Sequence, residues 1–146
     1  MRKTLLITAL LAVLHPVYAG PREDAVQVVE RWAKAFTDAE VDVIAGLYAP
    51  NATFFGTLDK TLTTQTADIR KYFERALLTG RPRTATLREH SVTVLSDTVV
   101  IVAGLDTVTA TRDGQTVSAP GRVTFVIERQ STGWKIVHFH RSPVPN

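Results

Sequence analysis

The chain has no cysteine among its 146 residues. Disulfide bonds, a thiol nucleophile and a thiolate metal site are therefore all excluded. Stability must come from the packing of side chains and from assembly, because no covalent cross-link is available to restrict the unfolded chain.

An excess of one charge is also missing. Lys and Arg number 17 and Asp and Glu number 14, and two of the basic residues, Arg2 and Lys3, lie at the extreme N-terminus. Because nucleic acids attract strongly basic surfaces, this near balance gives no support for a nucleic-acid partner. A Gly-x-Ser-x-Gly elbow, a Walker loop and a dinucleotide-binding fingerprint are absent as well, and we expect no cofactor.

The N-terminus has the outline of a signal peptide. A short basic region at residues 1–3 precedes an apolar run from Thr4 to Leu14, and Val17-Tyr18-Ala19 offers small residues to a signal peptidase. The apolar run is well short of the ~20 residues that a membrane-spanning helix needs. We therefore expect residues 1–19 to be removed and residues 20–146 to be periplasmic or secreted, free of the membrane; a retained membrane anchor is the alternative.

After the leader, about 127 residues remain, which suits one domain with one core. The first half of this domain has apolar residues spaced three and four apart, the period of an amphipathic helix. This pattern predicts three helices, near residues 26–36, 43–48 and 69–77. Pro50-Asn51 closes the second of these helices, and Thr66 or Asp68 caps the third.

The second half of the domain has the period of β-strands. Phe54-Phe55 predicts a short strand, residues 57–66 form a polar, exposed loop, and from Thr84 onward β-branched residues alternate with polar ones. Turn residues near 96–97, 112–114 and 131–133 separate four longer strands, which we expect to pair as antiparallel hairpins. Helices gathered on one side of a curled antiparallel sheet make an α+β fold.

The run GWKIVHFHRS, from Gly133 to Ser142, resembles the closing strand of the association (hub) domain of calcium/calmodulin-dependent protein kinases. Weaker similarity, in the expected order, covers Tyr48-Ala49-Pro50, residues 52–54, residues 72–74 and residues 122–128. The chain is also similar to the SnoaL-like and SgcJ/EcaC-type proteins of the same nuclear transport factor 2-like superfamily. That group contains isomerases, cyclases and members without known chemistry, so a shared fold does not decide the activity.

The resemblance implies a cone, in which the sheet curls around the helices and leaves a pocket at its open end. The outer, convex face of the sheet pairs subunits in such proteins, so we expect a homodimer or a higher homo-oligomer. In the kinase hubs, arginines from several strands line the pocket and attract carboxylates, and Arg122 and Arg141 match them here. Gly104 replaces another hub arginine, Ile69 a pocket histidine and Leu77 an aromatic gate, so the hub ligand itself does not carry over.

Strict alternation along the last strand gives the two histidines a common face. Trp134, His138 and His140 then lie together, whereas Phe139 and Arg141 lie on the opposite face. Two histidines alone do not complete a metal site, so we expect no metal, and the histidines are better explained as interface or sheet residues. Trp134 on their face favours burial against a partner.

Arg122 and Arg141 are the candidate anchors of the pocket. Arginine stays charged when buried and presents a planar fork to a carboxylate, so together they could clamp an anionic ligand. The alternative is an ion pair with Glu128, Asp106 or Glu89 that closes the mouth of the cone. Pockets are mostly apolar, and the expected apolar wall consists of Tyr48, Phe55, Tyr72 and Phe139.

Three functions remain open at this point: a small-molecule-binding domain, an enzyme and a purely structural oligomer with a filled cone. An isomerase, cyclase or hydrolase would need a carboxylate in the pocket, and Asp106 or Glu128 are the candidates. The short strand reads Phe54-Phe55-Gly56-Thr57, without the aspartate of ketosteroid-isomerase relatives, and Asp59 follows only in the loop. We assign no catalytic residue and favour the binding domain.

Overall fold

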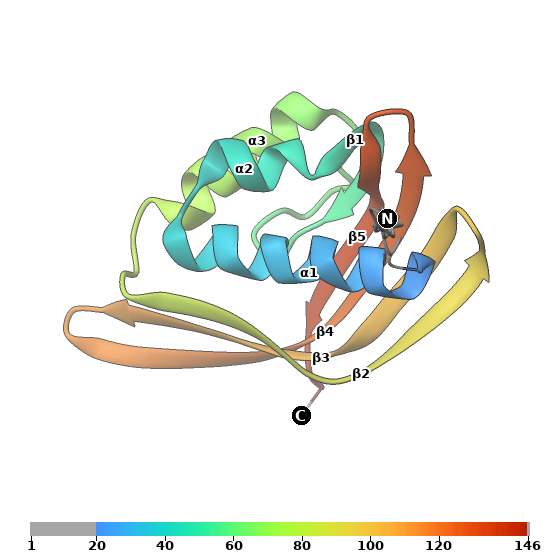
Figure 1. Cartoon of the computed structure of the whole chain (residues 1–146). Helices are drawn as coiled ribbons and strands as arrows, with labels where there is room; N and C mark the ends of the chain where they lie inside the picture. Colours follow the sequence, from blue (N-terminus) through green and yellow to red (C-terminus); the bar gives the residue numbers. More distant parts are fainter. Residues whose placement is uncertain (1–19, 146) are drawn as a thin grey trace, which may run out of the picture.

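The computed structural model of the protein describes residues 20–145, and the expected leader at residues 1–19 lies outside this range. Three helices lie against one face of a five-stranded sheet that curls around them (Figure 1). The elements are α1 (Pro21–Asp38), α2 (Val41–Gly46), β1 (Tyr48–Phe55), α3 (Thr66–Leu77), β2 (Arg83–Ser96), β3 (Val99–Arg112), β4 (Gln115–Gln130) and β5 (Gly133–Pro143). None of the described helices has the length and apolar character to cross a membrane.

The first helix has sequence features at both ends that fix its limits. Pro21 stands in the first turn, where its missing N–H costs nothing, and Glu23 and Asp24 lie near the positive end of the helix dipole. The chain leaves the helix at Ala39, which takes a left-handed conformation with φ of 59°. Its buried face consists of Ala25, Val28, Val29, Trp32 and Ala35. The predicted long helix is thus confirmed.

The second helix lies earlier in the chain than predicted, at Val41–Gly46 instead of 43–48. It ends at Gly46, and Tyr48 already begins strand β1, which therefore runs for eight residues through Pro50. The residue before a proline avoids the helical region, which favours an extended backbone at Ala49. Strand β1 then pairs in parallel with β5, with Tyr48 opposite Ile136 and Phe54 opposite Phe139.

The third helix begins where predicted but is capped differently. Gln65 occupies the N-cap position without a side-chain hydrogen bond to the helix. The Thr66 hydroxyl instead donates to the carbonyl oxygens of Ala49, at 3.3 Å, and Pro50, at 3.2 Å. Thr66 therefore ties α3 to β1 rather than capping its own helix.

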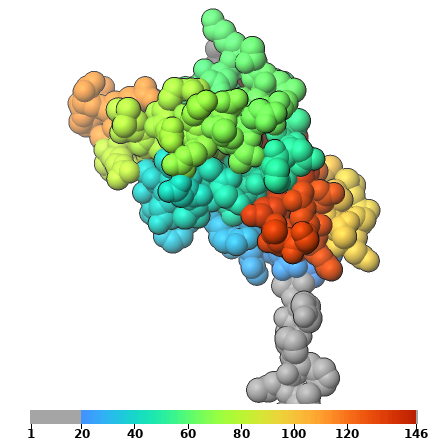
Figure 2. Space-filling model, turned by 90° about the horizontal axis from the view of Figure 1, so that it is seen from above, coloured from blue at the N-terminus to red at the C-terminus, as the bar shows by residue number. Residues whose placement is uncertain are grey.

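The strand order across the sheet is β1-β5-β4-β3-β2. Strands β2 to β5 form the predicted chain of antiparallel hairpins, whereas the β1–β5 pair is parallel, so the α+β fold contains a mixed sheet. The β3–β4 turn places Asp113 and Gly114 at φ of 50° and 76°, the positive values that a tight hairpin turn requires. The tip of this hairpin, drawn in orange in Figure 2, projects beside the end of α3.

The core is a cluster of aromatic rings between α1, α3 and the sheet. Trp32 stacks on Phe139 with ring centroids 5.3 Å apart, and Phe139 stacks on Phe54 at 5.1 Å. The indole N–H of Trp32 donates to the Tyr48 hydroxyl at 2.9 Å, so both polar atoms are satisfied inside the core. Burial raises the pKa of Tyr48 well above its usual value, and its hydroxyl stays neutral.

Candidate functional site

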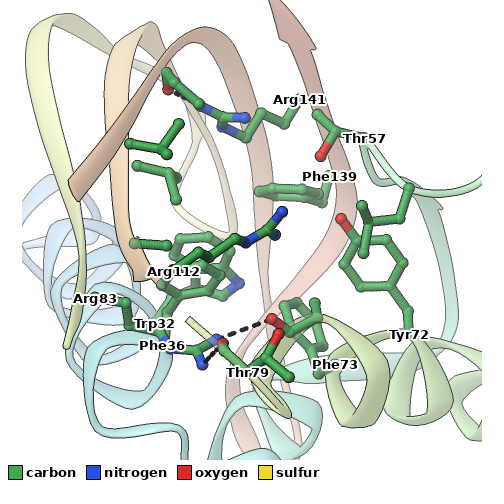
Figure 3. A pocket seen from close by; sticks show the side chains of 16 residues that line it. Trp32, Phe36, Thr57, Tyr72, Phe73, Thr79, Arg83, Arg112, Phe139 and Arg141 are labelled. Atoms are coloured by element: carbon green, nitrogen blue, oxygen red, sulfur yellow. Dashed lines mark hydrogen bonds between the residues drawn. The ribbon is translucent and has the colours of Figure 1, made fainter. Parts of the chain in front are cut away.

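A cavity of about 260 Å³ lies on the concave side of the sheet, between the helices and strands β3 to β5 (Figure 3). Its lining is mainly aromatic and aliphatic, with a few hydroxyl groups and three arginines. The lining residues are Trp32, Phe36, Thr57, Leu58, Tyr72, Phe73, Ala76, Thr79, Arg83, Val108, Ala110, Arg112, Val117, Ala119, Phe139 and Arg141.

Regular periods bring these side chains to one place. Trp32 and Phe36 are four residues apart on α1 and therefore share one helix face. On the strands, every second residue faces the cavity, as Val108, Ala110 and Arg112 do on β3. The cavity is thus built from the ordinary geometry of the fold.

Arg141 lies in the lining, but its charge is already paired. Its Nε donates to Asp106 at 2.7 Å, and its Nη2 donates to the carbonyl oxygen of Ala119 at 2.7 Å. The side chains of Arg141 and Asp106 are only 10% and 6% exposed. Of the two roles considered for Arg141, ligand anchor and ion pair, the structure contains the ion pair with Asp106.

A glycine on the neighbouring strand leaves room for this ion pair. A Cβ atom at Gly121 would come within 2.5 Å of Asp106 Oδ1 and 2.6 Å of Arg141 Nη2, far closer than atoms can pack. Asp106 Oδ1 itself is buried and has no hydrogen-bond partner within residues 20–145. The pair therefore occupies a space that only glycine at position 121 provides.

Arg83 lines the cavity near the end of α3 and is 4% exposed. It donates to the carbonyl oxygens of Ala76 and Leu77, both at 2.9 Å, and to that of Thr79. These carbonyls lack partners within the helix, so Arg83 closes the helix end. Burial, together with the positive charges of Arg81 and Arg112, lowers the pKa of Arg83.

Arg112 is the third arginine of the cavity, and the sequence analysis missed it. In Figure 3 its side chain runs across the middle of the cavity. It is exposed, and it makes no side-chain hydrogen bond or ion pair to any residue between 20 and 145. The turn residues at 112–114 place Arg112 in a turn by sequence. The alternation Val108-x-Ala110-x-Arg112 is the signal that the strand continues to it and that it shares a face with Val108.

Three of the six predicted pocket residues lie in the cavity lining: Tyr72, Phe139 and Arg141. Tyr48 lies deeper, in the aromatic core, where its hydroxyl is bonded to Trp32. Phe55 and Arg122 are on the opposite, convex face of the sheet, where Phe55 packs 5.5 Å from the His140 ring.

The prediction that Arg122 points into the hollow is wrong. Along β4 the buried side is taken by Gly121 and Val123, so alternation turns the intervening Arg122 outward. There it is exposed, and its Nε donates to the Ser142 hydroxyl at 3.3 Å. The proposed clamp of Arg122 with Arg141 therefore does not form.

Tyr72 places a hydroxyl at the edge of the cavity, beside Thr57. Burial is the main cause that raises the pKa of Tyr72, and hydrogen bonding to Thr57 partly offsets it. A Cβ atom at Gly56 would collide with the Tyr72 ring, so a glycine at this position lets the loop after β1 pass close to the tyrosine. Two residues of this loop, Thr57 and Leu58, are part of the cavity lining.

No carboxylate stands among the residues that line the cavity. Asp106 is paired with Arg141 and is not part of the lining. Glu128 lies on the convex side of β4, where it accepts a hydrogen bond from Gln130 Nε2 at 3.3 Å. Asp59, in the loop, is paired with Arg75 at 2.6 Å. Between residues 20 and 145 there is also no group of three potential metal-ligating side chains of the His, Cys, Asp or Glu type.

The last strand carries a β-bulge that changes which residues share a face. On β4, Val126 pairs with His138 but Ile127 pairs with Ile136, so Val137 is an extra residue. Trp134 consequently faces the helices, where its Nε1 donates to Asp24 at 3.0 Å. The prediction that Trp134 shares a face with the two histidines is wrong, because strict alternation ends at the bulge.

The two histidines remain together on the convex face. His138 Nδ1 lies 2.7 Å from the Thr53 hydroxyl on β1, within hydrogen-bond distance. Partial burial and then the neighbouring His140 lower the pKa of His138, which favours its neutral form. Each histidine is thus packed against the edge strand of the sheet.

Gly104 has a structural role that explains its departure from the hub pattern. It faces the bulge in β2, and a Cβ there would collide with the Glu89 carbonyl oxygen and with His90. Ile69 and Leu77, the other two departures, are buried core residues. An arginine at position 104 would therefore require the backbone of β2 to move.

Comparison with solved structures places the fold among known proteins. A protein from Xanthomonas campestris, named as a calcium/calmodulin-dependent protein kinase II association domain, is 25% identical, covers 97% of this chain and 99% of its own, and has a TM-score of 0.79. The corresponding kinase hub of S. rosetta is 26% identical, with coverages of 88% and 100% and a TM-score of 0.73. A nuclear transport factor 2-like protein of Salmonella enterica, 21% identical with coverages of 86% and 92%, shares the fold at a TM-score of 0.76.

These similarities confirm the resemblance inferred from the closing strand. No curated protein matches the sequence significantly. The SnoaL-like domain matches residues 25–146, which is most of the chain. The protein has the nuclear transport factor 2-like fold and belongs to the SnoaL-like domain family.

Proposed function

We propose that the protein is an exported, homo-oligomeric domain that binds a small, carboxylate-bearing molecule in the cavity of its cone. The observation that carries this proposal is the charge of the cavity. Three arginines line it, Arg141 alone of the three has a carboxylate partner among residues 20–145, and no carboxylate is part of the lining. An anionic ligand would supply the missing negative charge.

The rest of the lining suits an organic ligand. Ligand pockets are mostly apolar and contain a few polar groups that fix orientation. Here the aromatic rings supply the apolar wall, and the hydroxyls of Thr57 and Tyr72 add neutral hydrogen-bonding groups. Arg112 and Arg141 both belong to this lining, whereas Arg122 does not.

Ligand binding is tested with the mature chain, residues 20–146, titrated calorimetrically with a panel of small carboxylic acids and their neutral amides. We expect acids to bind and the matching amides to bind more weakly, because the amides carry no charge for the arginines. A panel in which no acid binds, or in which acid and amide bind equally, would contradict the proposed function.

Assembly through the convex face rests on the named hub neighbours and on apolar side chains that the sheet leaves exposed. Leu105, in the middle of β3, is 42% exposed on this face. We expect Leu105→Glu to dissociate the oligomer, whereas Leu78→Glu, at an exposed site beyond α3, leaves it intact. Light scattering that finds the wild-type chain monomeric would remove this part of the proposal.

Export follows from the leader sequence and is tested separately. Expression of the full chain in a bacterium, followed by cell fractionation and intact-mass measurement, should yield a periplasmic or secreted protein that begins at Gly20. A cytosolic product of full mass would contradict export without affecting the binding proposal.

The enzyme alternative has less support than the binding function. A proton-transfer enzyme needs a base in contact with its substrate, and neither Asp106 nor Glu128 lines the cavity. If an isomerase, cyclase or hydrolase activity were found, its loss in Asp106→Asn with ligand affinity preserved would revive this alternative.

A further inference from the structure

The three arginines of the cavity differ in how many of their donors are already in use. Arg141 has Nε and Nη2 bonded to Asp106 and to the carbonyl of Ala119. Arg83 has both terminal nitrogens bonded to carbonyls at the end of α3. Arg112 makes no such bond to residues 20–145, so it alone offers a complete guanidinium fork to a carboxylate.

A second group next to Arg112 also lacks an acceptor. Arg83 Nε is buried and has no hydrogen-bond partner among the described residues. The charge of Arg112 helps to lower the pKa of Arg83, which means that the two cations are close enough to repel each other. An anion bound at Arg112 would reduce this repulsion and bring an oxygen acceptor into the same part of the cavity.

The Arg112 side chain lies close to the turn between α3 and β2. Gly80, between α3 and β2, has φ of 79°, a conformation that side chains rarely adopt. A Cβ atom at Gly80 would lie 3.8 Å from Arg112 Nε and 3.1 Å from the Ala110 side chain. Arg112 Nε therefore lies near Gly80, and Figure 3 shows the guanidinium pointing into the cavity.

The size and lining of the cavity limit the rest of the ligand. An apolar cavity of about 150 Å³ is known to hold benzene, so about 260 Å³ has room for one ring with a short substituent. Five of the lining residues are aromatic: Trp32, Phe36, Tyr72, Phe73 and Phe139. Aromatic pairs in edge-to-face or offset contact gain more than their buried area alone provides.

We propose that the ligand is a monocyclic aromatic carboxylic acid, with its ring among the aromatic side chains of the cavity and its carboxylate on Arg112. This inference rests on the proposed binding function and sharpens it in two ways. It names the ligand class, and it assigns the anchor to the arginine at the β3–β4 hairpin instead of the paired Arg141.

The experiment measures the affinity of 3-phenylpropionate for the mature chain by calorimetry. Two analogues separate the contributions: 3-phenylpropionamide removes the charge, and 3-cyclohexylpropionate keeps the charge and similar bulk but removes the aromatic ring. The variant Arg112→Gln removes the fork, and Arg122→Gln, at an exposed arginine on the convex face, is the matched control. Circular dichroism checks that both variants remain folded.

We expect Arg112→Gln to weaken 3-phenylpropionate binding about 10- to 100-fold, the usual effect of losing hydrogen bonds to a charged group. Arg122→Gln should bind as the wild type does. The cyclohexyl analogue should bind about 2- to 10-fold more weakly than the aromatic acid, the range expected for lost aromatic contacts.

The outcomes distinguish this inference from the proposed function on which it rests. Equal affinity of wild type and folded Arg112→Gln would overturn the anchor assignment. A cyclohexyl analogue that binds as tightly as 3-phenylpropionate, or tighter, would overturn the aromatic class while leaving carboxylate binding in place. Failure of both acids to bind, while other acids of the panel bind, would overturn the ligand class alone. Failure of every acid of the panel, or equal binding of acid and amide, would overturn the binding function itself.

Discussion

Arg141 and Arg112 line the same cavity, but their charges have different surroundings. Arg141 is nearly buried and held by Asp106 and a carbonyl oxygen. Arg112 is exposed at the hairpin and has no partner among residues 20–145. An arginine that is already paired contributes to the fold, whereas an arginine without a partner is available to a ligand. Presence in a pocket lining is therefore a weaker sign of binding than an unused set of donors.

The same contrast applies to the two faces of the sheet. On the concave face, the buried Arg141 has a counter-charge, and Gly121 leaves room for the pair. On the convex face, the partly buried His138 lies within hydrogen-bond distance of the Thr53 hydroxyl and near a second histidine, His140, and its pKa is lowered by burial and by His140. Buried charge is retained where an opposite charge compensates it and is disfavoured where none does.

The largest effect is expected from removing the partner of Arg141. Asp106→Ala should lower the free energy of unfolding by about 3–5 kcal/mol, because it leaves a buried guanidinium without its counter-charge. Chemical denaturation measures this loss, with Glu30→Ala on the exposed face of α1 as the control. Recovery of most of the stability in the double variant Asp106→Leu, Arg141→Met would support the explanation. A loss in Asp106→Ala no larger than in the control would break the contrast between the two arginines.

A smaller loss is expected when the space for the ion pair is filled. Gly121→Ala should lower the free energy of unfolding by about 1–3 kcal/mol, the usual range for overpacking a buried site. Gly46→Ala is a matched control, because a Cβ there meets nothing within 4 Å and alanine favours the helix. If Gly121→Ala lowered the free energy of unfolding no more than Gly46→Ala does, the proposed role of Gly121 would be contradicted.

The histidine on the convex face gives a pH-dependent effect. Because its folded pKa is below the ordinary 6.5, the unfolded chain takes up a proton first as the pH falls. Stability contributed at this site is therefore intact above 6.5 and declines as the pH drops from there to the folded pKa. Unfolding measured from about pH 8 to about pH 5 should show a steeper acid loss for wild type than for His138→Gln. If the free energy of unfolding of wild type and His138→Gln had the same pH dependence, the lowered pKa of His138 would be contradicted.

The smallest effect is expected at the arginine that has no partner. Arg112→Gln should change the free energy of unfolding by less than about 0.5 kcal/mol, as is usual for an exposed side chain without specific contacts. Thermal and chemical denaturation of this variant beside Asp106→Ala measure the contrast directly. A destabilisation of Arg112→Gln as large as that of Asp106→Ala would mean that Arg112 is a structural residue and not a free anchor.

Much of the fold could be predicted from periodicity. The long helix, the third helix and the four hairpin strands follow local patterns that tertiary contacts reinforce. The end of the second helix was predicted too late because Leu47 and Tyr48 continue an apolar spacing, whereas Tyr48 pairs with Ile136 in the sheet. A contact between residues so far apart in the chain leaves no local signal.

The site was predicted less well, for reasons found in particular residues. Tyr72, Phe139 and Arg141 were placed correctly in the hollow of the cone by helix position or resemblance. Arg122 failed because a shift of one residue along a strand reverses the face. Arg112 was missed because a strand end and a turn look alike in sequence.

By itself the sequence determined the α+β class, the absence of disulfide cross-links and the resemblance of the closing strand to the hub domain. The tertiary structure alone decided which arginine is compensated, because Asp106 and Arg141 are 35 residues apart and meet only across the curled sheet. It also decided which side of the last strand Trp134 occupies, because one extra residue at Val137 resets the alternation. Composition and local period specify the elements, but register and bulges set the direction of each side chain.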